Sequence, residues 1–221
     1  MIIAIDGPAG TGKTTVAHAV AQELGFIYFD TGAMYRALTY GIISQQIDLE
    51  NAESLQQFLD THPVTIKTYL EEKNYYLGQE NVTDKIRSES VTKLVSKVSS
   101  YAAVREKMVS IQRSLAEGVN AVFEGRDIGT VVFPKADLKV FLTADLEIRA
   151  KRRRLQNGES GAPLEQVAEQ IASRDAQDAG RALSPMKAAD DAIVIDTTEL
   201  SIEEVVNKII NLKESAERDL L

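Results

Sequence analysis

Residues 7 to 14 have the spacing of a loop that binds a polyphosphate. They read Gly-Pro-Ala-Gly-Thr-Gly-Lys-Thr, which fits G-x-x-x-x-G-K-[ST]. The glycines allow the backbone to turn so that its N–H groups approach phosphate oxygens. Lys13 supplies a positive charge for the outer phosphates, and the Thr14 hydroxyl can reach a bound Mg²⁺. The residues of this loop predicted to bind a nucleoside triphosphate are Gly7, Pro8, Ala9, Gly10, Thr11, Gly12, Lys13, Thr14 and Thr15.

Two more clusters stand where predicted strands end, which is where open α/β sheets bind ligands. The first, Asp30 to Arg36, places an arginine one turn into a helix, from where its guanidinium can bind a phosphate. A capped helix with a surface arginine would have the same sequence. The second cluster, Glu124 to Thr130, holds an acid and an Arg-Asp pair between glycines, and it again predicts a site.

Basic residues are concentrated late in an acidic chain, whose formal net charge is −8. Arg149 and Arg153 are four residues apart, so a helix would place them on one face. Arg174, Asp178 and Arg181 have the spacing i, i+4, i+7 and are predicted to share another helix face. Such runs are often solvated faces or salt-bridge ladders. In a chain with a phosphate loop they also suit a clamp for anions.

Short apolar runs alternate with helical patterns along most of the chain. The expected strands are 2–5, 26–29, 121–123, 138–142 and 192–195, and the expected helices are 14–24, 31–43, 146–155, 164–175 and 202–212. Continuous apolar strands separated by helices indicate a parallel sheet with helices on both faces. We therefore predict a doubly wound α/β core of five parallel strands that carries the phosphate loop.

One segment departs from this alternation. Residues 64 to 82 are rich in Val, Ile, Thr and Tyr, and a polar turn is expected at Glu71 to Asn74. This composition predicts a small antiparallel β insertion over residues 62–85. A long helical stretch from Asp84 to Glu117 is expected to return to the core, which would then consist of residues 1–61 and 86–221.

The composition is that of an ordinary globular protein. The 221 residues are 44% hydrophobic and 26% charged, and no apolar run reaches the ~20 residues that span a bilayer. Cysteine is absent, which excludes disulfides and fits a reducing compartment. A strand begins at residue 2, so we expect no signal peptide, a cytoplasmic location and no membrane partner. The negative net charge argues against nucleic acid as a partner.

Several stretches together resemble the bacterial cytidylate kinases, which are nucleoside monophosphate kinases. They are IDGPAGTGKTT, DTGAMYR, the run from Ser96 to Arg105, GRDIGTVVFP, EIRAKRR, RDAQDAGRALSP and the late Ile-Asp-Thr-Thr. In this order they cover nearly the whole chain, which is far more specific than the phosphate loop alone. The resemblance implies that a monomeric enzyme of pyrimidine metabolism transfers a phosphoryl group from ATP to CMP or dCMP with Mg²⁺.

The resemblance also implies roles for individual residues. The catalytic residues would be Lys13, Arg126, Arg149 and Arg153. Arg149 would lie against the adenine of ATP and Arg153 on its phosphates. The residues implied to bind CMP are Thr31, Arg36, Ser96, Arg105, Arg126, Asp127, Arg174, Asp178 and Arg181.

Within the implied CMP site, three arginines correspond to those that bind the phosphate, namely Arg36, Arg126 and Arg181. Arg174 and Asp178 correspond to the pair that reads the ribose. The cytosine readers correspond to Ser96, Arg105 and Asp127. A carboxylate suits the base, since it accepts a hydrogen bond from the exocyclic amine that separates cytosine from uracil.

The chain departs from the family pattern in two places and agrees with it in a third. Glu124 stands where members often carry an aspartate, and its longer side chain could still join Thr14 in holding Mg²⁺, partly through water. The lid, at about residues 150–165, has a Gly-rich stretch from Gln156 to Gly161 in place of a lysine-glycine-aromatic pattern. The β insertion agrees, because long-insert members carry a three-stranded sheet in the monophosphate-binding region.

Two other functions remain compatible with a phosphate loop. One is a kinase of the same fold for another small acceptor, such as a different nucleoside monophosphate, shikimate or pantoate. The set of Ser96, Arg105 and Asp127 argues against it. The other is a regulatory protein that binds ATP without turnover, and the intact Lys13 with its many accompanying arginines argues against that.

Overall fold

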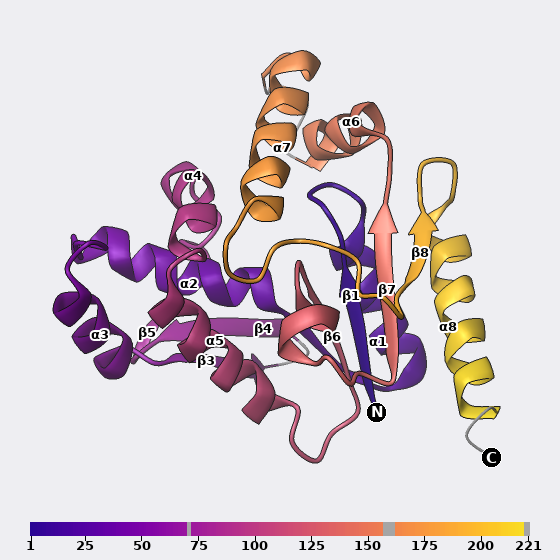
Figure 1. Cartoon of the computed structure of the whole chain (residues 1–221), viewed down its shortest axis with the longest axis horizontal. Coiled ribbons are helices and arrows are strands. Elements are labelled where there is room, and N and C mark those ends of the chain that lie inside the picture. The colour runs from indigo at the N-terminus through magenta and orange to yellow at the C-terminus, as the bar shows by residue number, and fades with distance from the viewer. Residues whose placement is uncertain (70–71, 157–161, 219–221) are drawn as a thin grey trace. The chain divides into compact units, whose positions relative to one another are not determined.

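The computed structural model describes residues 1–69, 72–156 and 162–218. Contacts divide the chain into two compact units, one formed by Met1–Asp30 with Ala116–Leu221 and the other by Thr31–Leu115. The first unit contains a five-stranded sheet and the second a three-stranded sheet (Figure 1). The predicted β insertion thus lies in a unit that also includes the helices before and after it in the chain.

The five strands of the first unit are all paired in parallel. Their order in the sheet is β2 (Ile27–Asp30), β6 (Ala121–Gly125), β1 (Ile2–Asp6), β7 (Leu138–Thr143) and β8 (Ile193–Asp196). The predicted five-stranded parallel sheet is confirmed. The register places Asp6 opposite Gly125 and Asp30 opposite Glu124, so two acids meet at the carboxyl edge of the sheet.

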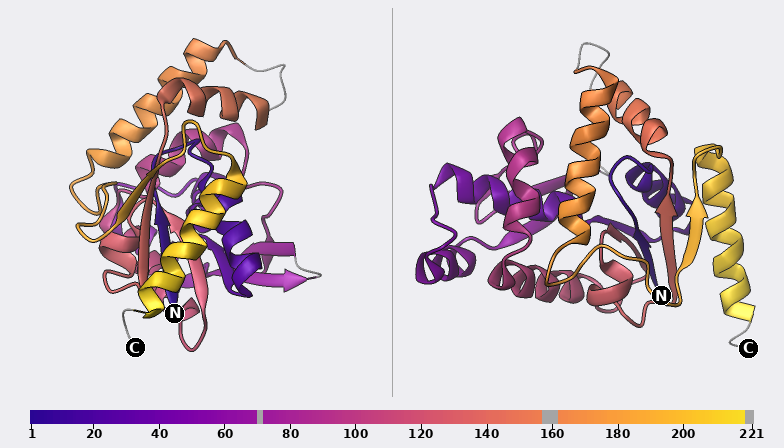
Figure 2. Two further views of the ribbon diagram at one scale, coloured as in Figure 1. Left: turned by 90° about the vertical axis from the view of Figure 1, so that its right-hand side faces the viewer. Right: turned by 45° about the horizontal axis from the view of Figure 1, so that its top comes forward.

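Four long helices accompany this sheet. Helices α1 (Lys13–Leu24) and α8 (Ile202–Arg218) contact each other and share one hydrophobic core with β1, β6 and β7. Helices α6 (Leu146–Gln156) and α7 (Leu164–Ala179) lie side by side in both Figure 1 and Figure 2. Residues 157–161 of the predicted lid are outside the described residues. A short π-helix, η1 (Ile128–Val132), follows β6.

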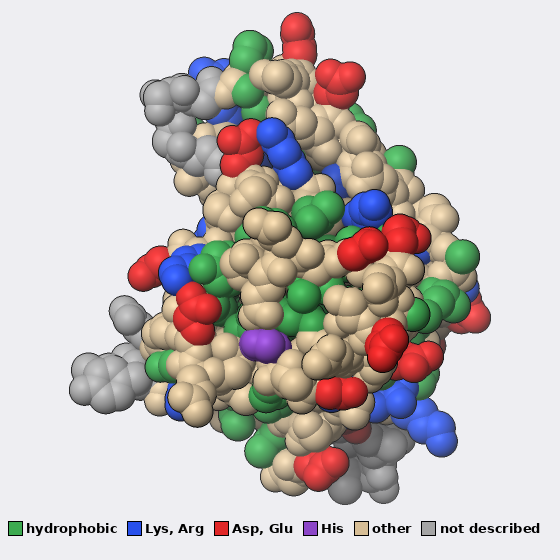
Figure 3. Space-filling model, turned by 90° about the vertical axis from the view of Figure 1, so that its left-hand side faces the viewer, with side chains coloured by type: hydrophobic (Ala, Val, Ile, Leu, Met, Phe, Trp, Pro, Cys, Tyr) green, Lys and Arg blue, Asp and Glu red, His purple; other side chains and the backbone are tan. Residues whose placement is uncertain are grey.

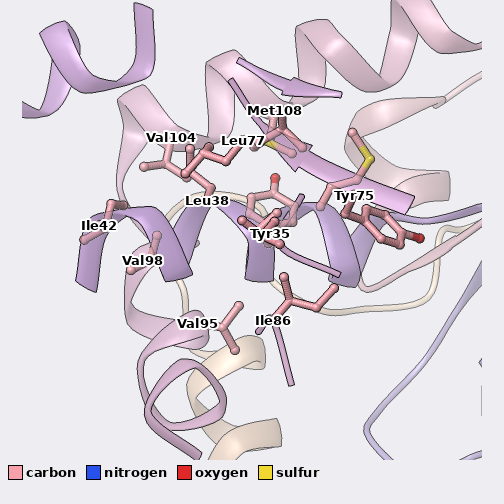
Figure 4. Packing of buried hydrophobic residues seen from close by; sticks show 14 of the residues in the cluster. Tyr35, Leu38, Ile42, Tyr75, Leu77, Ile86, Val95, Val98, Val104 and Met108 are labelled. Atoms are coloured by element: carbon pink, nitrogen blue, oxygen red, sulfur yellow. The ribbon is translucent and has the colours of Figure 1, made fainter. Parts of the chain in front are cut away.

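The second unit packs helices on a small antiparallel sheet. Its elements are α2 (Thr31–Ser44), α3 (Ala52–Thr61), β3 (Val64–Tyr69), β4 (Glu72–Leu77), β5 (Glu80–Asn81), α4 (Glu89–Val98) and α5 (Ala102–Leu115). In its core, Tyr35 and Leu38 of α2 lie beside Leu77 and Met108 (Figure 4). The packing is tight at Gly41, where an added Cβ would lie 2.1 Å from the Leu77 side chain.

Two expectations for this unit are wrong in detail. The long helical stretch is in fact two helices, because α4 ends at Val98 and α5 begins at Ala102. The hydroxyls of Ser99 and Ser100 donate to backbone carbonyls one turn back, at 3.1 and 2.7 Å, which competes with helix continuation. The turn expected at residues 71–74 is also misplaced, since β4 already begins at Glu72; residue 71 is not among the described residues.

One face of the molecule is mixed in charge. Figure 3 shows acidic and basic side chains scattered over the face that it draws, with hydrophobic side chains visible in small areas between them. Among the helices in the described ranges, none is both long and apolar enough to cross a membrane.

Candidate active site

The phosphate loop joins β1 to α1 and requires glycine at three positions. Gly7, Gly10 and Gly12 have φ values of +146°, +80° and +90°, a region that other residues rarely adopt. At Gly7 an added Cβ would lie 2.2 Å from the carbonyl oxygen of Leu142 on β7. The loop therefore lies directly against the carboxyl end of β7. Its last glycine leads into the N-terminus of α1, where backbone N–H groups attract anions.

Lys13 is buried beneath this loop. Its Nζ donates to the carbonyl oxygen of Pro8 at 2.6 Å and to Oγ1 of Thr11 at 3.4 Å. Burial lowers the pKa of Lys13 well below its usual value, and nearby Arg126 lowers it further, while surrounding acids oppose the shift. A bound triphosphate would add negative charge beside this buried ammonium group.

Glu124, at the end of β6, is hydrogen-bonded to the loop. Thr14 Oγ1 donates to its Oε2 at 3.1 Å, and the Tyr28 hydroxyl donates to its Oε1. Burial raises the pKa of Glu124 to about 7, and Asp30, its partner across the sheet, adds to the rise.

A magnesium site is chemically reasonable at Thr14 and Glu124. The described residues contain no group of three or more His, Cys, Asp or Glu that could hold a metal by themselves. Mg²⁺ usually takes one or two protein oxygens and completes its shell with phosphates and water. A threonine hydroxyl and a carboxylate oxygen 3.1 Å apart beside a phosphate loop fit that requirement.

Asp6 is a buried acid that sequence reasoning missed. Its two oxygens accept backbone N–H bonds from Ile128 at 2.9 Å and Gly129 at 2.7 Å. Burial raises its pKa to about 6 in spite of these bonds. Asp6 thereby ties the end of β1 to the loop that carries Asp127. Its position directly before the Gly-rich loop was the only signal in the sequence.

Arg149 is oriented by contacts within the first unit. Its Nε donates to the carbonyl oxygen of Ala144 at 3.0 Å, and its Nη1 donates to that of Ala9 at 3.1 Å. It also pairs with Asp175, which lies beside Arg174 in the RDAQDAGRALSP stretch but received no role of its own from the sequence. Arg153 is half-buried one turn further along α6.

A second arginine of α6 supports the phosphate loop indirectly. Arg152 donates to the Thr197 carbonyl oxygen at 2.7 Å and to its hydroxyl at 3.0 Å. The Thr197 hydroxyl in turn lies within hydrogen-bonding distance of two carbonyl oxygens, that of Thr11 at 3.2 Å and that of Thr143 at 3.0 Å. The late Ile-Asp-Thr-Thr stretch therefore reaches the loop, a role that the sequence did not suggest.

Asp178 brings two predicted CMP-binding arginines together. Its Oδ2 accepts from Nε of Arg126 at 3.2 Å, and its Oδ1 accepts from Arg181. Arg174 lies one turn earlier on α7. The expectation that Arg181 shares this helix face is wrong, because α7 ends at Ala179; Arg181 reaches Asp178 from the loop beyond. Asp127 is buried immediately after Arg126.

The second unit holds the remaining predicted CMP-binding residues, of which Thr31 is the first residue of α2. Arg36 Nη1 donates to the Thr92 hydroxyl at 2.9 Å and to the Ile86 carbonyl oxygen at 3.2 Å. Buried Arg105 lies over the Tyr35 ring, with its guanidinium carbon 5.5 Å from the ring centroid.

Ser99 connects two predicted cytosine readers. Its hydroxyl donates to the Ser96 carbonyl oxygen at 3.1 Å, and its own carbonyl oxygen accepts from Arg105 at 3.5 Å. Thr31, Arg36, Ser96 and Arg105 thus belong to one unit, whereas the other predicted CMP-binding residues belong to the unit with the phosphate loop.

Solved structures with the same overall fold include small-molecule kinases. A gluconokinase from Sinorhizobium meliloti superposes with a TM-score of 0.54 at 13% identity, covering 99% of this chain and 94% of that one. A shikimate kinase from Bacteroides thetaiotaomicron gives a TM-score of 0.53 at 17% identity, covering 97% and 98%. Identities this low show a shared fold and nothing about the substrate.

Sequence relatives are much closer. A cytidylate kinase of Protochlamydia amoebophila is 52% identical over 221 residues, which is 97% of each chain. One of Halalkalibacterium halodurans is 52% identical over 212 residues, covering 95% of this chain and 96% of that one. The sequence model of the family described as cytidylate kinase matches residues 3–215. With the phosphate loop intact and the match spanning nearly all of both units, the chain belongs to the cytidylate kinase family.

Proposed function

We propose that the chain transfers the terminal phosphoryl group of ATP to CMP or dCMP and so produces ADP and CDP or dCDP in pyrimidine nucleotide metabolism. The observation that carries the proposal is the family match over residues 3–215. A shikimate-like acceptor is not favoured, because the likeness to a shikimate kinase is one of fold alone at 17% identity.

On the donor side, the loop backbone and Lys13 would bind the phosphates of ATP. Arg149 and Arg153, one turn apart on α6, would face the same charge. Phosphoryl transfer depends on alignment and charge neutralisation more than on covalent help from the protein. A phosphate oxygen of CMP attacks the terminal phosphorus of ATP while the bond to ADP breaks. The acceptor oxygen is already ionised, so no strong general base is required.

Thr14 and Glu124 would hold Mg²⁺, with Glu124 acting directly or through water. When bound, the ion would neutralise phosphate charge during the transfer. Glu124 is held ready by Tyr28 and Thr14, which both donate to it. The pKa of Glu124 is about 7 without the ion, so this carboxyl group is partly protonated near neutral pH. A bound cation would favour loss of that proton.

On the acceptor side, Arg126 and Arg181 would bind the CMP phosphate while Asp178 keeps them in place. Arg36, anchored at Thr92, would be a third phosphate ligand. Arg174 with Asp178 would contact the ribose.

For the base, Asp127 would accept from the cytosine amine. Ser96 and Arg105 would bind the remaining ring atoms, and Arg105 is kept in place by Ser99 and the Tyr35 ring. These roles supply the contrast between cytosine and uracil, because a carboxylate only accepts hydrogen bonds.

We propose the same domain organisation as in the family. Residues 1–61 and 86–221 would form the kinase core, which includes a lid at about residues 150–165. Residues 62–85 would be a β insertion of the monophosphate-binding region. We also propose that the protein acts as a cytoplasmic monomer.

A substrate panel tests the proposed function. ADP release would be followed with ATP, Mg²⁺ and each of CMP, dCMP, UMP, AMP, GMP and shikimate. We expect CMP and dCMP to give the highest kcat/KM. A preference for shikimate or a purine nucleotide would contradict the proposed acceptor. ATP binding without ADP release on any acceptor would indicate a regulatory protein.

A further inference from the structure

Ala9 of the phosphate loop is bound to the α6–α7 helix pair through its backbone and its side chain. Its N–H donates to Oδ1 of Asp175 at 3.0 Å, and its carbonyl oxygen accepts from Arg149 at 3.1 Å. Its methyl group packs against a small core of Ala150, Val167 and Ile171. Both backbone hydrogen-bonding groups of this residue are therefore engaged by residues of these two helices.

Asp175 uses both carboxylate oxygens in this contact, one for Ala9 and the other for Arg149. The side chains of Arg149 and Asp175 are only 11% and 14% exposed. Hydrogen bonds between charged groups are stronger than neutral ones, and removing one partner of a buried ion pair is costly. At Gly10 an added Cβ would lie 3.0 Å from the Cβ of Arg149, so the loop backbone rests directly on α6 at this point.

We infer that Asp175 is a positioning residue for the donor site, which fixes the shape of the phosphate loop at Ala9 and the direction of the Arg149 guanidinium. This inference rests on the proposed function, in which Arg149 binds ATP. Asp175 acts through these two neighbours and touches no reacting atom. The Ala9 N–H is engaged by a carboxylate and does not face a phosphate oxygen. Ala9 therefore contributes to ATP binding through the shape of the loop.

Removal of the Asp175 carboxylate would disturb two parts of the donor site together, the loop backbone at Ala9 and the direction of the Arg149 guanidinium. A small error in aligning a phosphoryl group has a large effect on rate, roughly a hundredfold for ~1 Å.

Two substitutions separate the charge of Asp175 from its hydrogen bond. Asp175→Ala removes both contacts, whereas Asp175→Asn can still accept from the Ala9 N–H through its amide oxygen. We expect kcat to fall roughly tenfold to a hundredfold in Asp175→Ala and less in Asp175→Asn, with the KM for CMP nearly unchanged. Glu169→Ala, an exposed acid on the same helix, is the matched control and should behave as wild type.

Coupling to Arg149 distinguishes positioning from a general structural effect. The double variant Arg149→Ala, Asp175→Ala should lose clearly less kcat than the product of the two single losses, because Asp175 acts partly through that arginine. Losses that simply multiply would overturn the inference. If Asp175→Ala fails to fold, Asp175→Asn is the variant to measure, because it keeps the side-chain volume. A kcat of Asp175→Asn equal to that of wild type would overturn the role of the charge.

ATP binding, measured by calorimetry without an acceptor, gives a readout that does not depend on the proposed acceptor. We expect Asp175→Ala to bind ATP with equal or lower affinity than wild type. Tighter ATP binding with kcat retained would show that Asp175 competes with phosphate for the loop, and the inference would fail. No turnover of CMP by the wild type, with normal ATP binding, would instead refute the proposed function.

Discussion

Asp178 and Arg126 form an ion pair in which Nε of Arg126 lies 3.2 Å from Oδ2 of Asp178. The other oxygen of the same carboxylate binds Arg181. Asp178 is 1% exposed, and its single negative charge pairs with both guanidinium groups, so the three side chains together keep one net positive charge. Two cations that we propose as ligands of one phosphate are therefore held together by an acid of α7.

Replacing Asp178 with asparagine tests this arrangement. The side chain keeps its size, but Arg126 and Arg181 lose the charge that offsets their repulsion. We expect kcat/KM for CMP to fall by about one to two decades, equivalent to roughly 1.5–3 kcal/mol, with the KM for ATP little changed. Glu169→Gln on the exposed face of α7 serves as the control. Equal losses for ATP and CMP would show that Asp178 supports the whole unit instead.

Lys13→Ala should abolish most turnover and leave the fold intact. It removes a charge directed at the transferring phosphoryl group, so the loss should appear in kcat and reach roughly a hundredfold or more. Lys151→Ala is a suitable control, because Lys151 is an exposed lysine of α6 paired with Glu147. A normal kcat with only a raised KM for ATP would mean that Lys13 merely anchors the donor.

Glu124 should make the stability of the protein depend on pH. Its pKa is about 7 in the folded chain against 4.5 for an ordinary glutamate, so the folded state binds this proton more tightly. The favourable contribution is complete below pH 4.5 and is lost as the pH rises through about 7. Glutamine resembles the protonated form at every pH, and Glu124→Gln should therefore lack this loss.

Urea unfolding without nucleotide and Mg²⁺ provides the measurement. The free energy of unfolding of Glu124→Gln should approach that of wild type near pH 4.5 and exceed it by about 2–3 kcal/mol at pH 8. Asp6 has a raised pKa as well, but it is present in both proteins and its effect cancels. A difference between the two proteins that stays constant from pH 5 to pH 8 would contradict the assignment.

The sequence predicted best the features whose signal lies within a short stretch of consecutive residues. The strand that begins at Ile2, the glycines of the phosphate loop and the apolar run at Leu138 each carry their signal within a few residues. Because the five apolar strands alternate with helices, the parallel sheet followed from them as well. Repeated Tyr and Thr similarly predicted the β insertion.

The features that it predicted poorly depend on distant partners. Asp175 looks like any acid of a helix, and only the fold brings it to Ala9, which is 166 residues earlier in the chain. Asp6 gains its role from two N–H groups of the π-helix that follows β6. The break between α4 and α5 was missed because serine hydroxyls that bond to nearby carbonyls end a helix without glycine or proline.

The choice of base should depend on Asp127. A carboxylate accepts the cytosine amine and repels the carbonyl that uracil presents at the same place. Asp127→Asn can offer either an oxygen or an NH₂ group, so it should relax the choice between CMP and UMP. Losing a charge-assisted hydrogen bond costs roughly 1.5–3 kcal/mol, or about one to two decades in kcat/KM for CMP.

UMP should be affected less than CMP in this variant, because Ser96 and Arg105 would still bind the remaining ring atoms. The measurement is the ratio of kcat/KM for CMP to that for UMP in wild type and Asp127→Asn, with the exposed Asp190→Asn as control. Asp127 also affects Asp6, because the charge of Asp127 contributes to the raised pKa of Asp6. If both values fall together and the ratio holds, Asp127 acts on the loop that Asp6 anchors, and base reading belongs to Ser96 and Arg105 alone.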